Sequence, residues 1–328
     1  MTQRENARRT SRRRFLTIAG LAGVSAVTVG CLRKSTLPAW TWNGILFGAD
    51  VSISLHGMPS EQRARSLSEQ CFREMRRLER MFSLYLPDSA ICRLNTHGLL
   101  RKCPAEFIAL VKESLRLNKL TRGAFDITVQ ALWKTMDEHD YCIGPPSDTL
   151  LSAALSKVSS DHVRIDNDTI SFGQPGMAMT LNGIAQGFIT DRVADLLRDQ
   201  GVERSLVNMG EYRAIGHHPE GRAWNLGIRE PGASFGGALL DSVPLEEDRA
   251  LAVSGGYGYT FDPNRKHHHL LHPQTGENMP TDRSVVVVAP TATIADALST
   301  ACAVLDDEAA HSISRDLNCE LRIYREIT

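Results

Sequence analysis

The feature that most constrains the fold is a long apolar stripe at helical spacing that follows an alternating segment. Residues 51–55 alternate between apolar and polar side chains after a short apolar run at 45–47, which is typical of a strand. The helical stripe comprises Ala64, Leu67, Cys71, Met75, Leu78 and Phe82. Residues three and four apart share one helix face, so this pattern predicts a long amphipathic helix packed on a core.

Further helices and strands are expected along the chain. Helices are predicted at 104–120, 184–197 and 292–305, the second of them closed by Gly201, and buried strands at 205–209 and 284–289. Strands and helices are mixed without a regular alternation, which favours an α+β fold. We expect two lobes with a break near 145–175, where Gly and Pro are frequent.

Composition limits the class of protein. With 328 residues, 42% of them hydrophobic, the chain can bury a full core and is neither disordered nor a disulfide miniprotein. The net charge is −1, but residues 1–30 carry six Arg and one Glu, so the remainder has a net charge of −6. A mildly acidic body argues against a general nucleic-acid-binding protein.

The first 31 residues have the pattern of an export signal. Ser11-Arg12-Arg13-Arg14-Phe15-Leu16 precedes an apolar run of about 16 residues, shorter than the roughly 20 that a spanning helix needs. The pattern predicts twin-arginine export to the periplasm, leaving residues 32–328 as the mature domain. The alternative interpretation is an ordinary basic arm or a short anchor.

The seven cysteines have no spacing typical of a zinc site. Cys31 ends the signal segment and is a candidate for lipid attachment, which would hold the protein at a membrane; cleavage before Trp40 is the alternative. Cys71 and Cys302 lie on apolar helix stripes, so we expect them in the core.

Three polar or glycine-containing segments are candidates for ligand contact. The first is a turn after the long helix and contains Ser83, Tyr85, Ser89 and Asn95; the second is 123–128, with Phe125 and Asp126. The third, 181–187, places Gly183 and Gly187 at a helix start, where free amides favour an anion. Each of the three is equally compatible with a local turn or cap.

A run of histidines, residues 267–269 with His272, is the most unusual stretch. It is compatible with a zinc or copper site, although no carboxylate or cysteine partner is evident nearby. One of these histidines could instead act as a general base.

Asp296 and Thr300 are four residues apart and would share one helix face. A carboxylate and a hydroxyl are hard oxygen ligands, which suit Mg²⁺ beside a phosphate. The alternative is a solvated Asp with a Thr bonded to its own helix.

Taken in order, these segments resemble the ApbE-type FAD:protein FMN transferase family over nearly the whole mature chain. The matching motifs are Ser83-x-Tyr85, Gly123 to Thr128, Gly183 to Gly187, Val207 to Gly210, Ser254-Gly255, His269 to Gly276 and Ala295 to Thr300. The resemblance implies a two-lobed flavin transferase fold. It also implies an enzyme that moves FMN from FAD to a Thr or Ser hydroxyl of an electron-transfer protein, with Mg²⁺, and releases AMP.

The resemblance implies roles for individual residues. Asp296 and Thr300, with a carbonyl near Gly183, would hold Mg²⁺, and His269 would accept the proton of the acceptor hydroxyl. The amides of Gly183, Ile184 and Gly187 would cradle phosphate. The remaining cofactor-binding candidates are Ser83, Tyr85, Ser89, Asn95, Phe125, Asp126, Ser254, Gly255 and Thr275.

The chain departs from the family pattern at several positions. Thr180 stands where the family has Asp, Gln186 where it has Lys, and Gly210-Glu211-Tyr212 where it often has Gly-Gly-Asp. A Gln cannot supply the positive charge of a Lys. The segment 181–187 is similar to the branch associated with nitrous oxide reductase maturation, so a flavoprotein of nitrous oxide respiration is the acceptor to expect.

Three alternatives remain beside the transferase. The chain could be a non-catalytic FAD-binding or flavin-delivery protein for a respiratory metalloenzyme, an FAD pyrophosphatase, or a metal-handling factor that uses the histidine run. In that family His267, His268 and His272 have no assigned role, and we expect them to be solvated loop residues.

Overall fold

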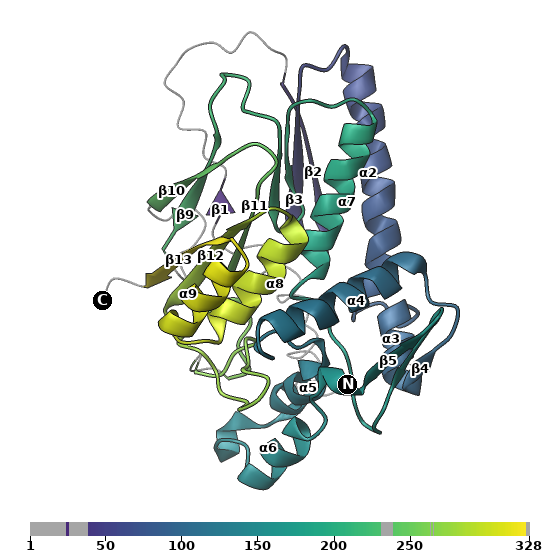
Figure 1. Cartoon of the computed structure of the whole chain (residues 1–328), viewed down its shortest axis with the longest axis vertical. Coiled ribbons are helices and arrows are strands. Elements are labelled where there is room, and N and C mark those ends of the chain that lie inside the picture. The colour runs from purple at the N-terminus through teal and green to yellow at the C-terminus, as the bar shows by residue number, and fades with distance from the viewer. Residues whose placement is uncertain (1–23, 26–38, 231–238, 263, 265, 326–328) are drawn as a thin grey trace.

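A seven-stranded antiparallel sheet forms the centre of the protein (Figure 1). The computed structural model describes residues 24–25, 39–230, 239–262, 264 and 266–325. The strand order is β13-β12-β11-β8-β7-β3-β2. These strands are β2 (Ala39–Leu46), β3 (Ala49–His56), β7 (Ser205–Asn208), β8 (Tyr212–Ile215), β11 (Ala250–Gly255), β12 (Arg283–Ala289) and β13 (Glu320–Arg325).

Two three-stranded sheets flank the central one. The first has the order β1-β9-β10 and the second β4-β6-β5. Their strands are β1 (Val24–Ser25), β9 (Trp224–Arg229), β10 (Leu239–Leu245), β4 (Leu99–Leu100), β5 (Val163–Asp166) and β6 (Thr169–Phe172). The mixture of antiparallel sheets and helices confirms the predicted α+β class.

Helices cover the sheets and form the lower part of the molecule in Figure 1. They are α2 (Glu61–Phe82), α3 (Ala90–His97), α4 (Ala105–Leu120), α5 (Gln130–Glu138), α6 (Asp148–Leu155), α7 (Ala185–Asp199), α8 (Ala292–Ala303) and α9 (Asp307–Asp316). Short 3₁₀ turns occur at Ile127–Val129, Tyr141–Ile143 and Ser160–His162.

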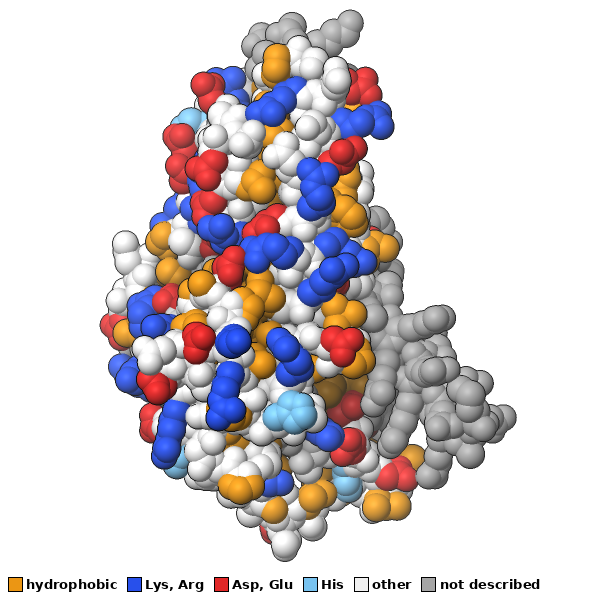
Figure 2. All heavy atoms as spheres, turned by 90° about the vertical axis from the view of Figure 1, so that its right-hand side faces the viewer, with side chains coloured by type: hydrophobic (Ala, Val, Ile, Leu, Met, Phe, Trp, Pro, Cys, Tyr) orange, Lys and Arg blue, Asp and Glu red, His pale blue; other side chains and the backbone are white. Residues whose placement is uncertain are grey.

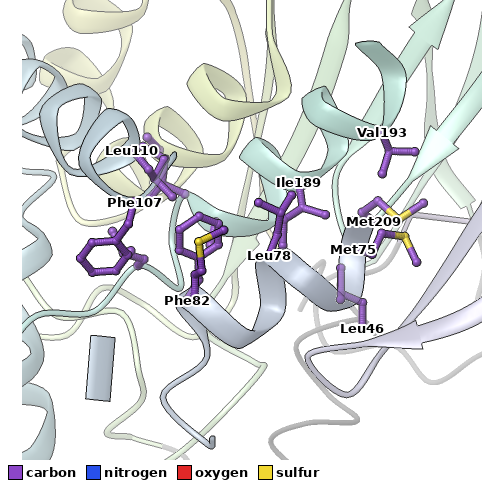
Figure 3. Close-up of a cluster of buried hydrophobic side chains, with 14 of the residues drawn as sticks. Leu46, Met75, Leu78, Phe82, Phe107, Leu110, Ile189, Val193 and Met209 are labelled. Atoms are coloured by element: carbon purple, nitrogen blue, oxygen red, sulfur yellow. The ribbon is translucent and has the colours of Figure 1, made fainter. Parts of the chain in front are cut away.

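Helix α2 begins and packs as its sequence predicts. The Ser60 side chain caps the helix by accepting a hydrogen bond from the Arg63 amide. All six residues of the predicted stripe are buried, and Leu78 and Phe82 lie with Phe107 and Ile189 in one hydrophobic cluster (Figure 3). Each large aliphatic side chain buried in this way contributes about 1.5–3 kcal/mol to folding.

The other predicted helices and strands are also present. The sequence analysis did not predict β2 as a separate strand. Helices α4, α7 and α8 and strands β7 and β12 lie where they are expected. The apolar run at 45–47 is not part of the strand at 51–55. It ends β2, which pairs with β3 as a hairpin. Phe47 and Gly48 both have positive φ and form the turn between the two strands.

The largest hydrophobic cluster extends from Leu46 to Ala301 and therefore contains residues from both sides of 145–175. The lobe boundary near that segment stays a prediction. The export signal and Cys31 lie outside the described residues, apart from Val24 and Ser25. Cys71 and Cys302 are buried and unpaired, as predicted, and burial raises the pKa of each thiol to about 12.

Charges of both signs alternate on the face that carries α2 and α4 (Figure 2). Arg77 pairs with Glu74 and Glu106, and Arg116 pairs with Glu113. Several of the basic side chains are therefore paired with carboxylates of α2 and α4. Among the described residues, no helix is both long and apolar enough to span a bilayer.

Candidate active site

A cavity of about 620 Å³ is lined by residues of α5, of the start of α7 and of one face of α8. Its size is within the range of pockets that bind organic molecules. The residues that line it from α5 and its neighbours are Phe47, Leu84, Tyr85, Val129, Gln130, Trp133, Lys134, Asp137 and Glu138. Those from the opposite wall and the floor include Thr180, Asn182, Gly183, Gln186, Glu211, Ser254, Gly255, Tyr257, Tyr259, His269, Asp296 and Thr300.

A smaller cavity of about 60 Å³ adjoins the large one. The two share Thr180, Gly183, His269 and Thr300 in their lining. The smaller cavity adds Phe125 and Asp126, which were expected at the site. The two spaces therefore meet at the residues for which the sequence analysis predicts metal binding and proton transfer.

The close approach of α7 to α8 depends on Gly187. A Cβ atom at Gly187 would lie 2.2 Å from the carbonyl oxygen of Ala292, so no larger residue fits. The Gly187 amide donates a 2.9 Å hydrogen bond to Asp296 Oδ2. Because this amide is already bonded to a carboxylate, the phosphate-cradling role expected for it does not fit. The glycine instead brings Asp296 to the wall of the cavity.

Asp191 fixes the start of α8 against α7. Its carboxylate accepts hydrogen bonds from the amides of Ala292 (2.9 Å) and Thr293 (2.8 Å) and from the Thr293 hydroxyl (2.6 Å). Arg213 pairs with it at 2.7 Å. A carboxylate at a helix N-terminus accepts hydrogen bonds from the free amides there, and its negative charge interacts favourably with the positive end of the helix dipole. The sequence analysis assigned Asp191 no role.

Two carboxylates are buried at the cavity wall. Asp296 is 5% exposed and Glu211 is 8% exposed. Burial, together with the charge of Asp191, raises the pKa of Asp296 to about 7, against the opposing hydrogen bond from Gly187. Burial and then the charge of Asp296 raise the pKa of Glu211 well above its usual range. The charge that acts most strongly on each of these two carboxyl groups is therefore that of another carboxylate and not that of a cation.

Thr300 and Gly183 are in contact across the cavity floor. A Cβ atom on Gly183 would lie 2.9 Å from Thr300 Oγ1, so glycine leaves room for the hydroxyl. Thr300 is one turn beyond Asp296 on α8, as its spacing predicts. Together they place a hydroxyl and a carboxylate on the same wall. The described residues contain no group of three or more His, Cys, Asp or Glu arranged to hold a metal.

His269 presents a neutral imidazole to both cavities. Its Nδ1 lies 3.1 Å from the carbonyl oxygen of Tyr259, which accepts a hydrogen bond if that nitrogen carries the proton. Burial, and then the neighbouring His268, lower the pKa of His269 to about 4. At neutral pH the ring is therefore uncharged, and a nitrogen without a proton can act as a base.

The other histidines of the run do not form a metal site. His268 is fully buried, with Nε2 2.7 Å from the Met279 carbonyl oxygen and Nδ1 accepting from the Leu270 amide, so both ring nitrogens are bonded. The expectation that His268 is solvated is wrong. It packs under Gly256, where a Cβ atom would lie 2.8 Å from the ring. His267 stacks on Tyr141 at 4.5 Å.

Of the residues predicted for cofactor binding, some line the cavities and others serve the local fold. Tyr85, Gly183, Ser254, Gly255 and His269 line the large cavity, and Phe125 and Asp126 the small one. The side chain of Ser254 is hydrogen-bonded to that of Ser299 at 2.8 Å.

The remaining predicted residues do not line either cavity. Ser83 and Ser89 accept hydrogen bonds from the amides of Tyr85 and Cys92, as turn and cap residues do. Ile184 is fully buried in the core. Thr275 is exposed and bonded to Glu277. Asn95 acts through the backbone of Met179, to which it makes two hydrogen bonds.

Asp126 lines the small cavity, but its carboxylate organises protein groups. It accepts hydrogen bonds from Thr128, Ser160 and Asn118, at 2.6–3.2 Å. It therefore holds the start of the Ile127–Val129 turn against the segment at 160. Any contact with a ligand would be made by the neighbouring Phe125 or by the backbone.

Sequence reasoning missed the wall formed by α5. Trp133 stacks on Tyr259 at 5.7 Å, and the Tyr259 hydroxyl donates to Asp137. Lys134, on the same helix, also lines the cavity. The aromatic pair offers a flat apolar surface of the kind that ring ligands bind.

Two of the departures from the family pattern, Thr180 and Gln186, lie at the cavity. Gln186 lines the large cavity and donates to the Met209 carbonyl oxygen at 3.3 Å. The Thr180 hydroxyl accepts a hydrogen bond from the Asn182 amide, and its own amide donates to Ile127. Both side chains therefore support the loop at 180–186, and neither adds a charge to it.

The chain is similar to known proteins over most of its length. The model of the ApbE family matches residues 47–323. A FAD:protein FMN transferase of Vibrio cholerae serotype O1 is 28% identical over 285 residues, 83% of each chain. A FAD:protein FMN transferase of Haemophilus influenzae is 30% identical over 256 residues, which are 72% of this chain and 71% of the relative.

Solved structures give the same result. The flavin transferase ApbE from Vibrio cholerae superposes with a TM-score of 0.75 at 25% identity, covering 88% of this chain and 98% of that one. The apo form of the Pseudomonas stutzeri flavinyl transferase ApbE has a TM-score of 0.76 at 25% identity, covering 89% and 92%.

Proposed function

Because the chain belongs to the ApbE family, we propose that this enzyme transfers FMN from FAD to a Thr or Ser hydroxyl of a partner protein and releases AMP. The observation that carries the proposal is the meeting of a neutral His269 with Asp296 and Thr300 around one pair of joined cavities. A base and a set of hard oxygen ligands on one cavity are the groups that phosphoryl-type transfer requires.

The reaction balances with the groups at the site. The acceptor oxygen forms a bond to the FMN-side phosphorus, and the bond from that phosphorus to the bridging oxygen breaks, so AMP leaves with the bridging oxygen. His269 accepts the proton of the acceptor hydroxyl. Burial keeps the pKa of His269 near 4, so the imidazole is unprotonated at neutral pH and ready for this step.

The donor set of the site fits Mg²⁺. Asp296 and Thr300 supply a carboxylate and a hydroxyl, and Gly183 brings its backbone against Thr300. Oxygen ligands of this kind suit Mg²⁺, which commonly uses few carboxylates together with substrate phosphates. When bound, Mg²⁺ would neutralise charge on the pyrophosphate. Within the described ranges, no cationic side chain is paired with Asp296 or Glu211, which supports a place for a metal ion beside them.

The remaining wall supports binding of the substrate rings. Trp133 and Tyr259 form an aromatic surface, and Tyr85 and Phe125 add further rings at the two cavities. We assign these residues to flavin and adenine contacts as a group. Lys134 also lines the cavity, and its ammonium group lies 3.9 Å from a carboxylate oxygen of Glu138 on the same helix.

The cellular setting remains part of the proposal. The twin-arginine pattern before residue 31 supports export to the periplasm, and Cys31 supports attachment to the membrane. The acceptor would then be an exported or membrane electron-transfer protein, and the likeness of 181–187 favours one of nitrous oxide respiration. An exported reporter fused to residues 1–38, followed with and without Arg12 and Arg13, tests the route.

The test of the function is direct. The purified protein is incubated with FAD, Mg²⁺ and an acceptor domain that carries a reactive Thr, and the acceptor is weighed by intact mass spectrometry. A mass gain of one FMN residue supports the transferase. Cleavage of FAD without any gain supports a pyrophosphatase, and bound but intact FAD supports a flavin-delivery protein. A His269→Ala variant that still modifies the acceptor at the normal rate would contradict the base role.

A further inference from the structure

We propose that Glu211 is a second carboxylate ligand of the divalent cation site that contains Asp296. This inference rests on the proposed function, because it concerns the metal that the transferase site would hold. The sequence analysis noted Glu211 only as a departure from a glycine-containing motif.

Glu211 is positioned by the first turn of α7. It lies at the end of the β7–β8 turn, whose Gly210 has a φ of 107°. The Gln186 side chain donates to Met209, and the Thr190 hydroxyl lies 3.3 Å from the Glu211 carbonyl oxygen. A Cβ atom on Gly210 would lie 2.2 Å from Gln186 Nε2, so the turn packs tightly on the helix. The backbone that carries the carboxylate is thus firmly held.

The same turn of α7 holds Asp296. Gly187, next to Gln186, donates its amide to Asp296 Oδ2 at 2.9 Å. One helical turn therefore locates both carboxylates, and both line the large cavity. Their arrangement comes from α7 and not from a flexible loop.

Among the residues that the structure describes, no Lys, Arg or His forms an ion pair with Glu211 that would explain its burial. It is 8% exposed, and the charge that acts on it most strongly is another carboxylate, Asp296. A backbone hydrogen bond from Val253 supports it, but that bond leaves acceptor capacity free. Asp191, the next carboxylate, is already paired with Arg213. Two buried carboxylates in the lining of one cavity are costly unless a cation offsets their charge.

A divalent cation bound by the side chains present would offset the free-energy cost of burying two carboxylates. Asp296, Glu211 and Thr300 provide three hard oxygen ligands on one wall, which is the chemistry that Mg²⁺ and Mn²⁺ prefer. Gln186 stands where the resemblance implies a Lys, and its side chain adds no positive charge to this wall. The site then takes its positive charge from the metal.

Mn²⁺ binding to the full protein without FAD tests the proposal, with electron paramagnetic resonance as the readout of free ion. We expect Glu211→Gln to raise the dissociation constant at least tenfold and Asp296→Asn to abolish binding. The exposed Glu246→Gln variant is the matched control and should bind as the wild type does. Equal affinity of Glu211→Gln and wild type would overturn the proposal while leaving the transferase function intact.

Two further measurements separate a ligand from other effects. Glu211→Asp keeps the charge but shortens the reach, so a ligand role predicts affinity at least threefold weaker, and unchanged affinity would indicate a through-space effect and overturn the proposal. Thermal unfolding of each variant confirms that it folds. Wild-type protein that neither binds Mn²⁺ nor needs a metal for transfer would refute the metal site of the proposed function itself.

Discussion

Asn95 and Met179 are joined by two hydrogen bonds, one in each direction. The Asn95 side-chain amide donates to the Met179 carbonyl oxygen at 2.8 Å, and the Met179 amide donates to Asn95 Oδ1 at 2.7 Å. The pair connects α3 to the segment that enters the loop at 180–183. Asn95 was expected to contact a cofactor; in the structure it holds the segment that leads to the cavity-lining residues Thr180 and Gly183.

Replacing Asn95 by Ala should loosen this loop. Two hydrogen bonds are lost and a partly buried backbone segment is left unsatisfied, so we expect a loss of about 1–3 kcal/mol in unfolding free energy. The KM for FAD should rise by a larger factor than kcat falls, because the loop at 180–183 lines the cavity and its displacement weakens binding more than it slows the chemical step. Steady-state kinetics and urea unfolding measure both quantities. Asn225→Ala on the exposed side of β9 is the control, and a similar effect there would contradict the argument.

Gly187→Ala should separate α7 from α8. The new methyl group would overlap the Ala292 carbonyl oxygen, and overpacking of this kind costs about 1–3 kcal/mol or more. Metal-dependent transfer should fall at least tenfold, since Asp296 moves with α8. Gly201→Ala, which meets no neighbouring atom but has a φ of 79°, controls for backbone strain alone. Thermal melting and initial rates for both variants check this prediction, and equal effects would count against it.

His269 should make the fold less stable in acid. Its pKa is lowered to about 4 in the folded state, whereas an unfolded His titrates near 6.5. Between these values the unfolded chain binds more protons, so the contribution of His269 to stability is present above pH 6.5 and is lost as pH falls toward 4.

The corresponding measurement is thermal unfolding of wild type and His269→Gln from pH 4 to 7.5. The melting temperature of the variant should depend less on pH than that of the wild type. Part of the dependence should remain, because burial also lowers the pKa of His268 and His218. Identical pH profiles for the two proteins would be inconsistent with a buried neutral His269.

Asp296→Asn should abolish the response to Mg²⁺. The amide is similar in shape and can still accept the Gly187 hydrogen bond through its oxygen, but it lacks the charge that a hard cation needs. We expect transfer to fall at least 100-fold at every Mg²⁺ concentration, with FAD binding at least partly retained. Asp195→Asn, at an exposed position of α7, should behave as the wild type.

Elements with a complete apolar stripe could be predicted from the sequence, and elements at the cavity could not. The stripe of α2 is buried throughout its length, so its pattern is unambiguous. Helix α5 buries Ala131, Leu132 and Met136 but turns Trp133 and Asp137 toward a cavity. A helix that turns one face to the core and another to a cavity lacks a single regular apolar stripe. The sequence pattern therefore did not predict this helix.

The residues of the site also divide into those that the sequence could predict and those that it could not. Asp296 and Thr300 are one turn apart on a single helix, a relationship that spacing alone reveals. Glu211 reaches the same cavity from the turn between β7 and β8, and its place there depends on how the sheet packs against α7. The hydrogen bonds of Asp126 to Ser160 and of Asn95 to Met179 likewise join residues far apart along the chain.

The attachment of α8 to α7 through Asp191 has a consequence for how this enzyme could be altered. Because three hydrogen bonds join that carboxylate to the first turn of α8, the helix pair keeps its spacing whatever happens on the opposite wall. Substitutions in α5 can therefore change the shape of the substrate space without disturbing Asp296 or Thr300. Directed evolution toward new acceptors or flavin analogues should accumulate its mutations in α5 and leave the α7–α8 pair untouched.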